Sequence, residues 1–469
     1  MGCIFALGWK LNLSQSGVRF KMIDLRRLTW RRANPLRADT PARSSAALGA
    51  LMTALIAFAL MPTAICAQGR IDTQPLTLAR MSEEVATNNP QIEQARQAYI
   101  ASTAQVKIVT TLPNPTAFIY ETPIANNPLR LGASQGFSYS IGQPFLFPGK
   151  QRLAGESAEH QAEFAKTQME SLLLQLLSQL KSNFYQLQLY RLQQSIIRET
   201  LIRFDQLKQL ARARYASNAA GYVDYLNAQV AYSSAENDLF AVQRNIDTTR
   251  ATINTLMGRD PNTALEVQDR PYTPEMPAAT LAELEALTLK TQPVLNGATA
   301  LIRSGESNLD LAKLAYYPDF NLVMSFISDN PPWGVAQGNQ YGMELDLILP
   351  TWFFTREKAA RDQANANLIA ARASFDALRQ QVLLQLASSY NSLAQAVNQF
   401  KFLESRQLPQ AQAAYRLAIA NYANNASAFA DVQTAALNLR TTESSIAQAR
   451  VSVAQAHASL VATIGKEIE

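Results

Sequence analysis

The stretch Arg214-Tyr-Ala-Ser-Asn-Ala-Ala-Gly-Tyr-Val-Asp224 returns later in the chain as Asn421-Tyr-Ala-Asn-Asn-Ala-Ser-Ala-Phe-Ala-Asp431. The tyrosines Tyr215 and Tyr422 are 207 residues apart, and so are the two closing aspartates. Gly258 and Gly465 keep the same offset of 207. This period is far longer than the roughly 20–50 residues of a solenoid repeat. The sequence therefore predicts one large unit that was duplicated and fused, with internal pseudo-symmetry.

Each half shows the same order of predicted elements: a helix, two strands, a very long helix, a turn and a shorter helix. Prolines punctuate both halves at matching places, with Pro113 and Pro144 followed by Pro318 and Pro350. The expected helices before the strands cover 90–111 and 293–316, the long helices 149–215 and 355–422, and the returning helices 222–257 and 429–464. Pro409 lies inside the second long helix, where it should kink or interrupt it.

The predicted strands alternate in polarity. In the clearest one, Tyr341, Met343, Leu345, Leu347 and Leu349 alternate with residues that include Glu344 and Asp346. One face of such a strand suits lipid, and the other, with its two carboxylates, suits the water-filled lumen of a membrane barrel. Four strands per chain are too few to close a useful barrel, and an open sheet edge in lipid leaves backbone groups unsatisfied. Several chains should therefore contribute strands to one barrel.

The first long helix, about 67 residues, would span about 100 Å. Its leucines and phenylalanine at 173, 177, 180, 184 and 187 step by 4, 3, 4 and 3, the spacing of a coiled-coil seam. The returning helices are half as long. The helices before the strands have the length needed to cover the rest of each long helix.

The chain has 469 residues, 17% charged residues and a net charge of +5, with much of the positive charge before residue 45. An apolar run from Ala46 to Ala59 follows, which together with the basic stretch predicts a secretory signal over 1–67. We expect cleavage after Ala67, with Met22 an alternative start; a retained anchor helix is the minor alternative. Cys66 raises the further alternative of lipidation, although Ile65 precedes it where a lipobox wants a small residue.

The predicted organisation is the leader 1–67, a first repeat 68–257, a connector 258–280 and a second repeat 281–469. The first repeat holds barrel strands within 114–147 and a long hairpin 149–257. The second holds strands within 318–350 and a hairpin 355–464. The connector is rich in proline and lies where the halves meet.

The order, the repeat and the duplicated turn resemble the TolC-type outer-membrane efflux channels of Gram-negative bacteria, in style nearest the branch serving heavy-metal and multidrug pumps. The strand-to-helix corners Gln143-Pro-Phe-Leu-Phe-Pro-Gly-Lys150 and Leu349-Pro-Thr-Trp-Phe-Phe-Thr-Arg356 are similar too. The resemblance implies a mainly α homotrimer with a twelve-stranded β-barrel in outer-membrane lipid and a periplasmic helical tunnel. It also implies a periplasmic adaptor protein and an inner-membrane RND-type pump as partners.

The resemblance also implies a periplasmic gate. Asp224 and Asp431 match aspartates near the closed entrance, and Tyr422 matches a tyrosine that holds the closed state by interchain hydrogen bonds; Tyr215 is its counterpart in the first repeat. The chain departs from drug-type members at Ser427, where they carry arginine, and at Thr434, where they carry a second aspartate. The lock should therefore be weaker or built differently. The alternative reading is that the two aspartates only cap helices.

The turns themselves are the predicted docking sites for the adaptor, because small side chains let hairpin tips interlock. The residues are Arg214, Ala219, Ala220, Gly221, Asn424, Asn425, Ala426 and Ser427. The alternative is that they form ordinary turns and that Arg214 is merely solvated.

Catalysis is not expected. His160 and His457 lie on separate helices, and no clustered metal ligands, nucleophile–base pair or phosphate loop appears. We expect no cofactor, no bound metal and no nucleic-acid partner. The predicted function is a passive, gated efflux conduit. The alternatives are the outer component of a type I protein-secretion system and a periplasmic coiled-coil scaffold without transport activity.

Overall fold

The computed structural model describes residues 12–14, 17–19, 76–122, 136–268, 276–329 and 338–466. Apart from residues 12–14 and 17–19, the predicted signal lies outside the described residues, and so do its cleavage site and Cys66. The chain divides into two compact units, one of residues 1–79 and 264–268, and one of residues 80–263 and 269–469. In the first, strands β1 (Asn12–Ser14) and β2 (Gly17–Arg19) pair antiparallel, and Leu76 bridges Val267 in parallel. Both repeats otherwise belong to the second unit, which is described below.

The predicted order of elements is confirmed in both halves. The first repeat consists of α2 (Leu78–Asn88), α3 (Pro90–Thr110), β3 (Thr116–Thr122), β4 (Gly136–Phe145), α4 (Lys150–Ala216) and α5 (Tyr222–Leu256). The second consists of α6 (Leu281–Thr291), α7 (Pro293–Leu314), β5 (Asp319–Asp329), β6 (Gly338–Ile348), η3 (Phe353–Glu357), α8 (Lys358–Phe402), η4 (Leu403–Gln407), α9 (Leu408–Ala423) and α10 (Phe429–Ile464). Helix α4 has 67 residues, as the absence of proline predicted.

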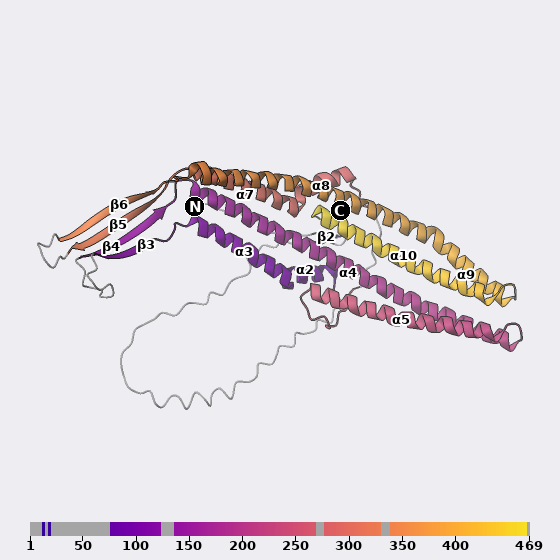
Figure 1. The fold of residues 1–469 in the computed structure, drawn as a ribbon. Helices are drawn as coiled ribbons and strands as arrows, with labels where there is room; N and C mark the ends of the chain where they lie inside the picture. The colour runs from indigo at the N-terminus through magenta and orange to yellow at the C-terminus, as the bar shows by residue number, and fades with distance from the viewer. Residues whose placement is uncertain are drawn as a thin grey trace, which may run out of the picture. The chain divides into compact units, whose positions relative to one another are not determined.

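Pro409 does interrupt the second long helix. A short π-helical turn, η4, separates α8 from α9, and the proline falls in the first turn of α9. A proline inside a helix removes one i→i−4 hydrogen bond, and a π-turn is one way for the backbone to accommodate the loss. The axis of the long helix continues into α9 beyond it (Figure 1).

The four long strands form one antiparallel sheet in the order β3-β4-β5-β6. Its register aligns Ile141, Met324 and Met343 on one face, and Gly142, Val323 and Glu344 on the other. The first face is apolar and exposed: Tyr341 is 84% accessible and Met343 77%. Strand β4 continues past Pro144 because residues 143–145 pair only with β5, so the missing N–H of the proline falls where β3 offers no partner.

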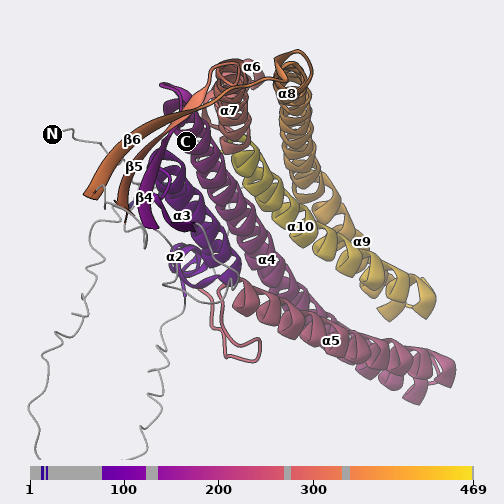
Figure 2. The same cartoon turned by 60° about the vertical axis from the view of Figure 1, so that its left-hand side comes forward.

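The helices lie side by side, with the sheet at one end and the hairpin tips α4–α5 and α9–α10 at the other (Figures 1 and 2). Near the sheet, α4 packs between α3 and α7, and α7 packs on α8; near the tips, α4 packs between α5 and α10, and α10 packs on α8 and α9. The repeats are therefore not separate compact units, since α4 of the first lies against two helices of the second.

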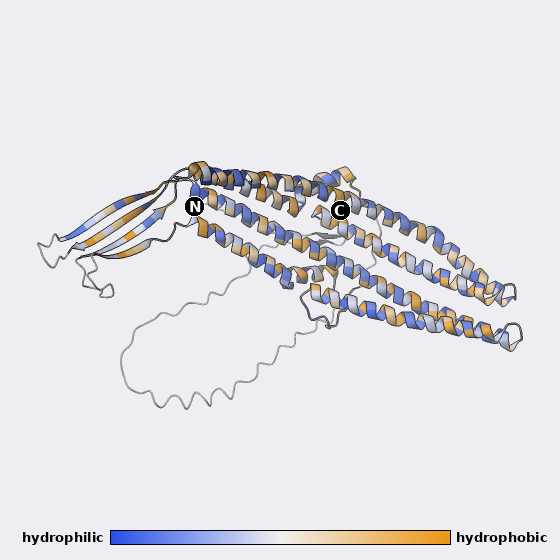
Figure 3. Ribbon diagram, in the orientation of Figure 1, coloured by the Kyte–Doolittle hydropathy of each residue, from blue (hydrophilic) through white to orange (hydrophobic). Residues whose placement is uncertain are grey.

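The seam predicted on α4 is buried, with Leu180 and Leu187 at most 1% accessible. Burying a leucine contributes about 1.5–3 kcal/mol. Polar pairs add to the contact between repeats: Ser157 Oγ lies 3.0 Å from Ser304 Oγ, and Arg203 of α4 binds both carboxylate oxygens of Glu443 of α10 at 2.8 Å. Figure 3 shows apolar and polar residues interleaved along every long helix, as a two-sided layer requires.

The short helices dock on the ends of the returning helices in the same way in both repeats. Asn89, between α2 and α3, donates its side-chain amide to Leu256 O at 2.8 Å, and Gln292, between α6 and α7, donates to Thr463 O at 2.7 Å. Gly258 and Gly465 end the returning helices with φ of +73° and +79°. This close approach is the physical reason for the repeated glycine.

We expect Gly258→Ala to destabilise the fold, because its φ is left-handed and a Cβ would lie 2.4 Å from Asn88 O. The matched control is Gly221→Ala, where φ is −74° and a Cβ would meet nothing closer than 4.0 Å. Thermal unfolding in detergent should show a clear loss of midpoint for the first variant and little for the second. Equal midpoints would contradict the docking described here.

Candidate channel gate at the hairpin tips

The two hairpin turns have the same backbone geometry. Asn218 and Asn425, 207 residues apart, both adopt a left-handed conformation, with φ of 59° and 58°. Asparagine is among the few non-glycine residues that tolerate this region. In each turn an alanine N–H closes on a carbonyl five residues earlier, Ala219 on Arg214 O at 2.8 Å and Ala426 on Asn421 O at 2.7 Å. The resemblance between the two sequences therefore extends to the backbone.

Arg214 joins the two hairpins. From the end of α4 its guanidinium donates to the backbone oxygen of Tyr422 and the side-chain oxygen of Asn425 in the second hairpin, and to Ala219 O in its own turn at 3.1 Å. Its central carbon also lies 4.0 Å from the centre of the Tyr422 ring. Such a cation–π contact adds to the hydrogen bonds. The sequence alone did not predict these contacts of Arg214, because positions 214 and 422 are far apart in the chain.

Tyr422 is the buried centre of this junction, with 1% of its surface accessible. Its ring meets Phe429 edge-on at 5.7 Å and packs in a cluster with Phe204 and Leu207 of α4. Its hydroxyl donates to Asp224 Oδ2 at 3.0 Å. Both partners belong to one chain, so the hydrogen bond seen here joins the two repeats; the interchain role that the resemblance implies for Tyr422 stays a prediction.

Asp224 and Asp431 occupy the same position, the third residue of α5 and of α10, yet they do different things. Asp431 is exposed and accepts the Ala428 N–H at 3.1 Å, which is a capping contact. Asp224 is half-buried and accepts the Tyr422 hydroxyl. The capping interpretation therefore describes Asp431, whereas Asp224 serves the contact between repeats.

The remaining predicted gate and docking residues lie at the surface of the tips. Tyr215, the counterpart of Tyr422, is 48% accessible and lies 5.4 Å from the ring of Tyr222. The small turn residues are exposed or half-exposed: Ala219, Ala220, Gly221, Asn424, Ala426 and Ser427. The hydroxyl oxygen of Ser427 is itself enclosed without a hydrogen-bond partner. The turns thus present mostly small side chains to the outside.

Glu344 and Asp346 lie on β6, far from the tips, on the less apolar face of the sheet. Asp346 accepts a hydrogen bond from Asn321 Nδ2 at 3.2 Å, and Glu344 stands opposite Val323. The two carboxylates therefore share one face, as the alternation predicted.

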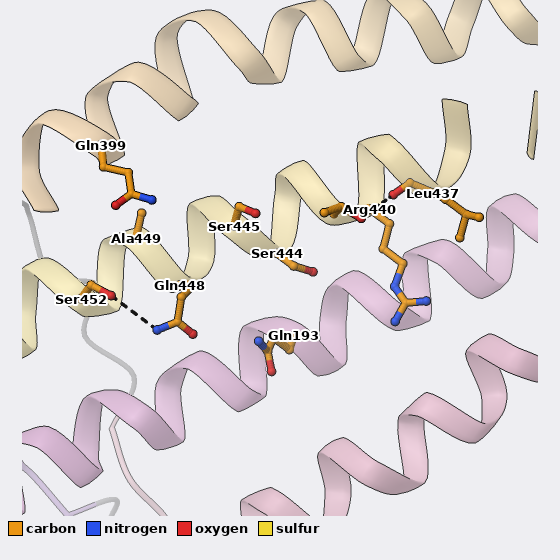
Figure 4. Close-up of a pocket in the computed structure, with 10 residues that line it drawn as sticks. Gln193, Gln399, Leu437, Arg440, Ser444, Ser445, Gln448, Ala449 and Ser452 are labelled. Carbon is orange, nitrogen blue, oxygen red and sulfur yellow. Dashed lines mark hydrogen bonds between the residues drawn. The ribbon is translucent and has the colours of Figure 1, made fainter. Parts of the chain in front are cut away.

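A groove of about 440 Å³ follows α10, between Gln193 of α4 and Gln399 of α8 (Figure 4). Its floor carries neutral polar side chains, and Gln448 donates to Ser452 at 3.4 Å. Arg440 also lines this groove and binds Asp238 at 2.6 Å. Within the described residues no group of three or more histidine, cysteine or acidic side chains is placed to hold a metal ion. Among the described helices, none combines the length and apolarity of a membrane span.

The environment of Tyr422 changes its acidity. Burial, followed by the hydrogen bond to Asp224 and its negative charge, raises the pKa of Tyr422 from 10.0 to about 12, while Arg214 acts in the opposite direction. A raised pKa means that the folded state favours the neutral phenol, so this contribution to stability is complete below pH 10 and is lost as the pH rises through about 12.

We therefore expect ultraviolet difference titration of the native protein against Tyr422→Phe to show one tyrosinate forming near pH 12. Asp224→Asn should bring that midpoint closer to the ordinary value, because the charge on the acceptor is removed. A Tyr422 midpoint near pH 10 would mean that the hydroxyl is solvated and the junction open.

The comparisons with known proteins agree with this architecture. A family model described as "Outer membrane efflux protein" matches residues 81–259 and 286–466, one segment in each repeat. The pyoverdine export outer membrane protein OpmQ of Pseudomonas aeruginosa is 24% identical over 62% of this chain, and the aligned part spans 60% of that relative. Toxin and drug export protein A of Aggregatibacter actinomycetemcomitans is 22% identical over 69% of this chain and 72% of its own length.

The solved outer-membrane channel OprN superimposes with a TM-score of 0.71 at 18% identity, covering 83% of this chain and 90% of OprN. At this identity the likeness shows the fold. The family match covers both repeats, and the chain therefore belongs to the outer membrane efflux protein family and is a protein of the outer membrane.

Proposed function

We propose that three copies of this chain form the outer-membrane channel of a tripartite efflux system, a passive conduit that a periplasmic adaptor joins to an inner-membrane RND-type pump. The observation that carries this proposal is that the sheet and the helical layer of one chain are each open on two sides in the described residues. The same holds for the helices near the sheet and for the helices near the tips. At each of these heights, one open side belongs to the first repeat and the other to the second.

In the sheet, β3 and β6 are the outer strands, and neither pairs with a further strand in the described parts of the chain. An apolar face as exposed as that of Tyr341 and Met343 suits lipid, and in lipid the outer strands must be paired. Joining β6 of one copy to β3 of the next closes a ring, and three copies give twelve strands, an even number as in bacterial barrels. A periplasmic scaffold would leave this face without a purpose.

The helical layer ends in α3 and α8 near the sheet, and in α5 and α9 near the tips. Each of these helices exposes large apolar side chains, among them Ile108 (66%), Phe240 (71%), Leu384 (71%) and Leu417 (62%). A head-to-tail contact that closes by rotation would cover them all at once. The same rotation pairs the outer strands of the sheet. One ring of copies therefore covers the exposed helix faces and also pairs the strands.

In that assembly the face with Glu344 and Asp346 lines the barrel lumen, since lipid-facing and lumen-facing residues alternate along a strand. The hairpin tips then converge at the periplasmic entrance. Three Asp431 carboxylates near one mouth raise the local negative potential and attract cations. The hydrogen bond between Tyr422 and Asp224 holds the two hairpin tips of each chain together.

The tips are also the proposed docking surface for the adaptor. Residues 219–221 and 424–427 present small side chains at the ends of both hairpins. Small side chains at these positions allow another helical hairpin to approach the turns closely. Arg214 belongs to the base of this surface, where it orders Ala219 and Asn425.

The cargo class follows from the relatives only as a proposal. OpmQ is a pyoverdine export protein, which favours small molecules, and the second relative is a toxin and drug export protein, which keeps toxin secretion as a second candidate function. A deletion strain tested against divalent metals, dyes, detergents and antibiotics would separate these. Sensitivity to metals alone assigns a metal pump, sensitivity to organic compounds assigns multidrug efflux, and no sensitivity contradicts efflux.

We expect Tyr422→Phe to increase single-channel conductance in planar bilayers, because the closed contact loses its hydrogen bond to a charged acceptor, worth about 1.5–3 kcal/mol. Asp431→Ala should reduce cation selectivity. Asp376→Ala, an exposed aspartate on α8, is the control and should change neither. Unchanged conductance and selectivity in both tip variants would reject the gate assignment.

A further inference from the structure

The two corners at which a strand leads into a long helix differ in how their cations are neutralised. In the first repeat, Lys150 begins α4 and its ammonium donates to Asp319 Oδ1 at 2.8 Å. Arg152, two residues later, pairs with Glu156. Both cations at the first corner therefore have a carboxylate partner. In the second repeat, Arg356 occupies the position of Lys150, 206 residues later, where η3 leads into α8 (Figure 1).

The second corner carries two cations without carboxylate partners. Arg356 and Lys358 are exposed, and neither forms an ion pair within the described part of the chain. The carboxylates nearest in sequence are engaged or enclosed: Asp362 pairs with Arg361 at 3.1 Å, and Glu357 is buried. The partner that the two side chains lack is thus an anion from outside the chain.

Exposed aromatic side chains come directly before these cations. Trp352 and Phe354 are 71% and 78% accessible. The backbone N–H of Arg356 donates to Trp352 O at 2.9 Å, so one helical turn separates the two residues. Phe354 and Lys358 are also four residues apart, and side chains at this spacing are neighbours on a helix surface. Each exposed ring therefore has a cation one turn further from the sheet.

The order of these side chains along the chain matches the order of layers in one leaflet of a bilayer. Strand β6 ends with the exposed apolar side chains of Leu345 and Leu347, and the aromatic residues and the cations follow. Hydrocarbon, an aromatic interface and charged headgroups succeed one another in the same way. At a rise of about 1.5 Å per residue, Arg356 lies about 6 Å beyond Trp352, comparable to the depth of a headgroup layer.

We propose that the second corner binds one anionic phospholipid of the leaflet next to the helices, with the phosphate between Arg356 and Lys358 and the acyl chains against Trp352 and Phe354. Arginine offers phosphate a planar fork of donors, and lysine offers a point charge. The inference rests on the outer-membrane location and the lipid-facing sheet, and it does not depend on the cargo. The first corner, with Leu146 in place of the indole and its cations already paired, binds no such lipid.

A neighbouring copy is the other candidate occupant, but its charges do not complement the corner. If β6 pairs with β3 of the next copy, the nearest segment is 105–116, which joins α3 to β3. Its single charged residue is Lys107, a cation. It has Asn114 at the position of Asp319, 205 residues earlier, so the carboxylate that neutralises Lys150 has no counterpart there. A contact between copies therefore leaves the cations of the second corner unpaired.

Native mass spectrometry of the purified protein in detergent, titrated with phosphatidylglycerol or with phosphatidylcholine, measures this binding. We expect one phosphatidylglycerol per chain at saturation and weaker binding of phosphatidylcholine, which has no net charge. Arg356→Gln and Lys358→Gln should each weaken phosphatidylglycerol binding about fivefold, and the double variant about 25-fold, because each cation near a membrane surface contributes about that factor.

Arg379→Gln is the matched control. Arg379 is exposed on the same helix and forms no ion pair within the described residues, but it lies about 35 Å further from the sheet. This variant should bind phosphatidylglycerol as the native protein does.

Brominated phospholipids test whether lipid reaches the aromatic residues. The fluorescence difference between the native protein and Trp352→Phe in lipid nanodiscs isolates the indole of Trp352. We expect bromine atoms near the headgroup end of the acyl chains to quench this signal more strongly than bromine atoms near the chain ends, because indoles lie at the interface.

Three results would overturn this inference: equal phosphatidylglycerol binding by the native protein and the double variant, an equal loss in Arg379→Gln, or a Trp352 signal that brominated lipid leaves unquenched. The last result would mean that a neighbouring copy covers the corner. The same mass spectra report the oligomeric state. Trimers without this lipid site contradict the inference alone, whereas lipid binding by a protein that forms no trimer contradicts the proposed channel alone.

Discussion

The packing of α4 on two helices of the second repeat is the interaction on which the rest of the structure depends. Near the sheet it holds α7, and near the tips it holds α10, so one 67-residue helix fixes the relative position of both halves. Leu189, which packs with Ala447 and Val451 of α10, and the ion pair between Arg203 and Glu443 are parts of that contact. With the repeats fixed to each other, the sheet and the tips fall at opposite ends of one layer.

Duplication explains much of the detail, and some of the duplicated positions have diverged. Some pairs kept one role, such as Gly258 and Gly465 at the ends of the returning helices. Others separated: Tyr422 became buried while Tyr215 stayed exposed, and Asp431 caps its helix while Asp224 accepts a hydroxyl.

Much of the fold could be predicted from the sequence, because its signals are local. The absence of proline predicted the length of α4, alternation located the strand Gly338–Ile348, and Pro409 located the interruption after α8. The prediction of close contacts was poorer. The continuation of β4 through Pro144 depends on which neighbouring strand is missing, and three of the four contacts of Arg214 depend on packing between residues more than 200 positions apart. At the candidate site the sequence identified the residues but not their different roles. It could not show that Asp224 accepts a hydroxyl while Asp431 caps its helix, since both occupy the same local position.

The proposed channel requires that identical neighbours close the open sides of each chain. Single-particle electron microscopy of the protein in lipid nanodiscs tests this closure most directly. We expect a threefold particle in which β6 of each copy pairs with β3 of the next and twelve strands cross the bilayer. A particle with another number of copies, or one in which β3 and β6 remain unpaired, would contradict it.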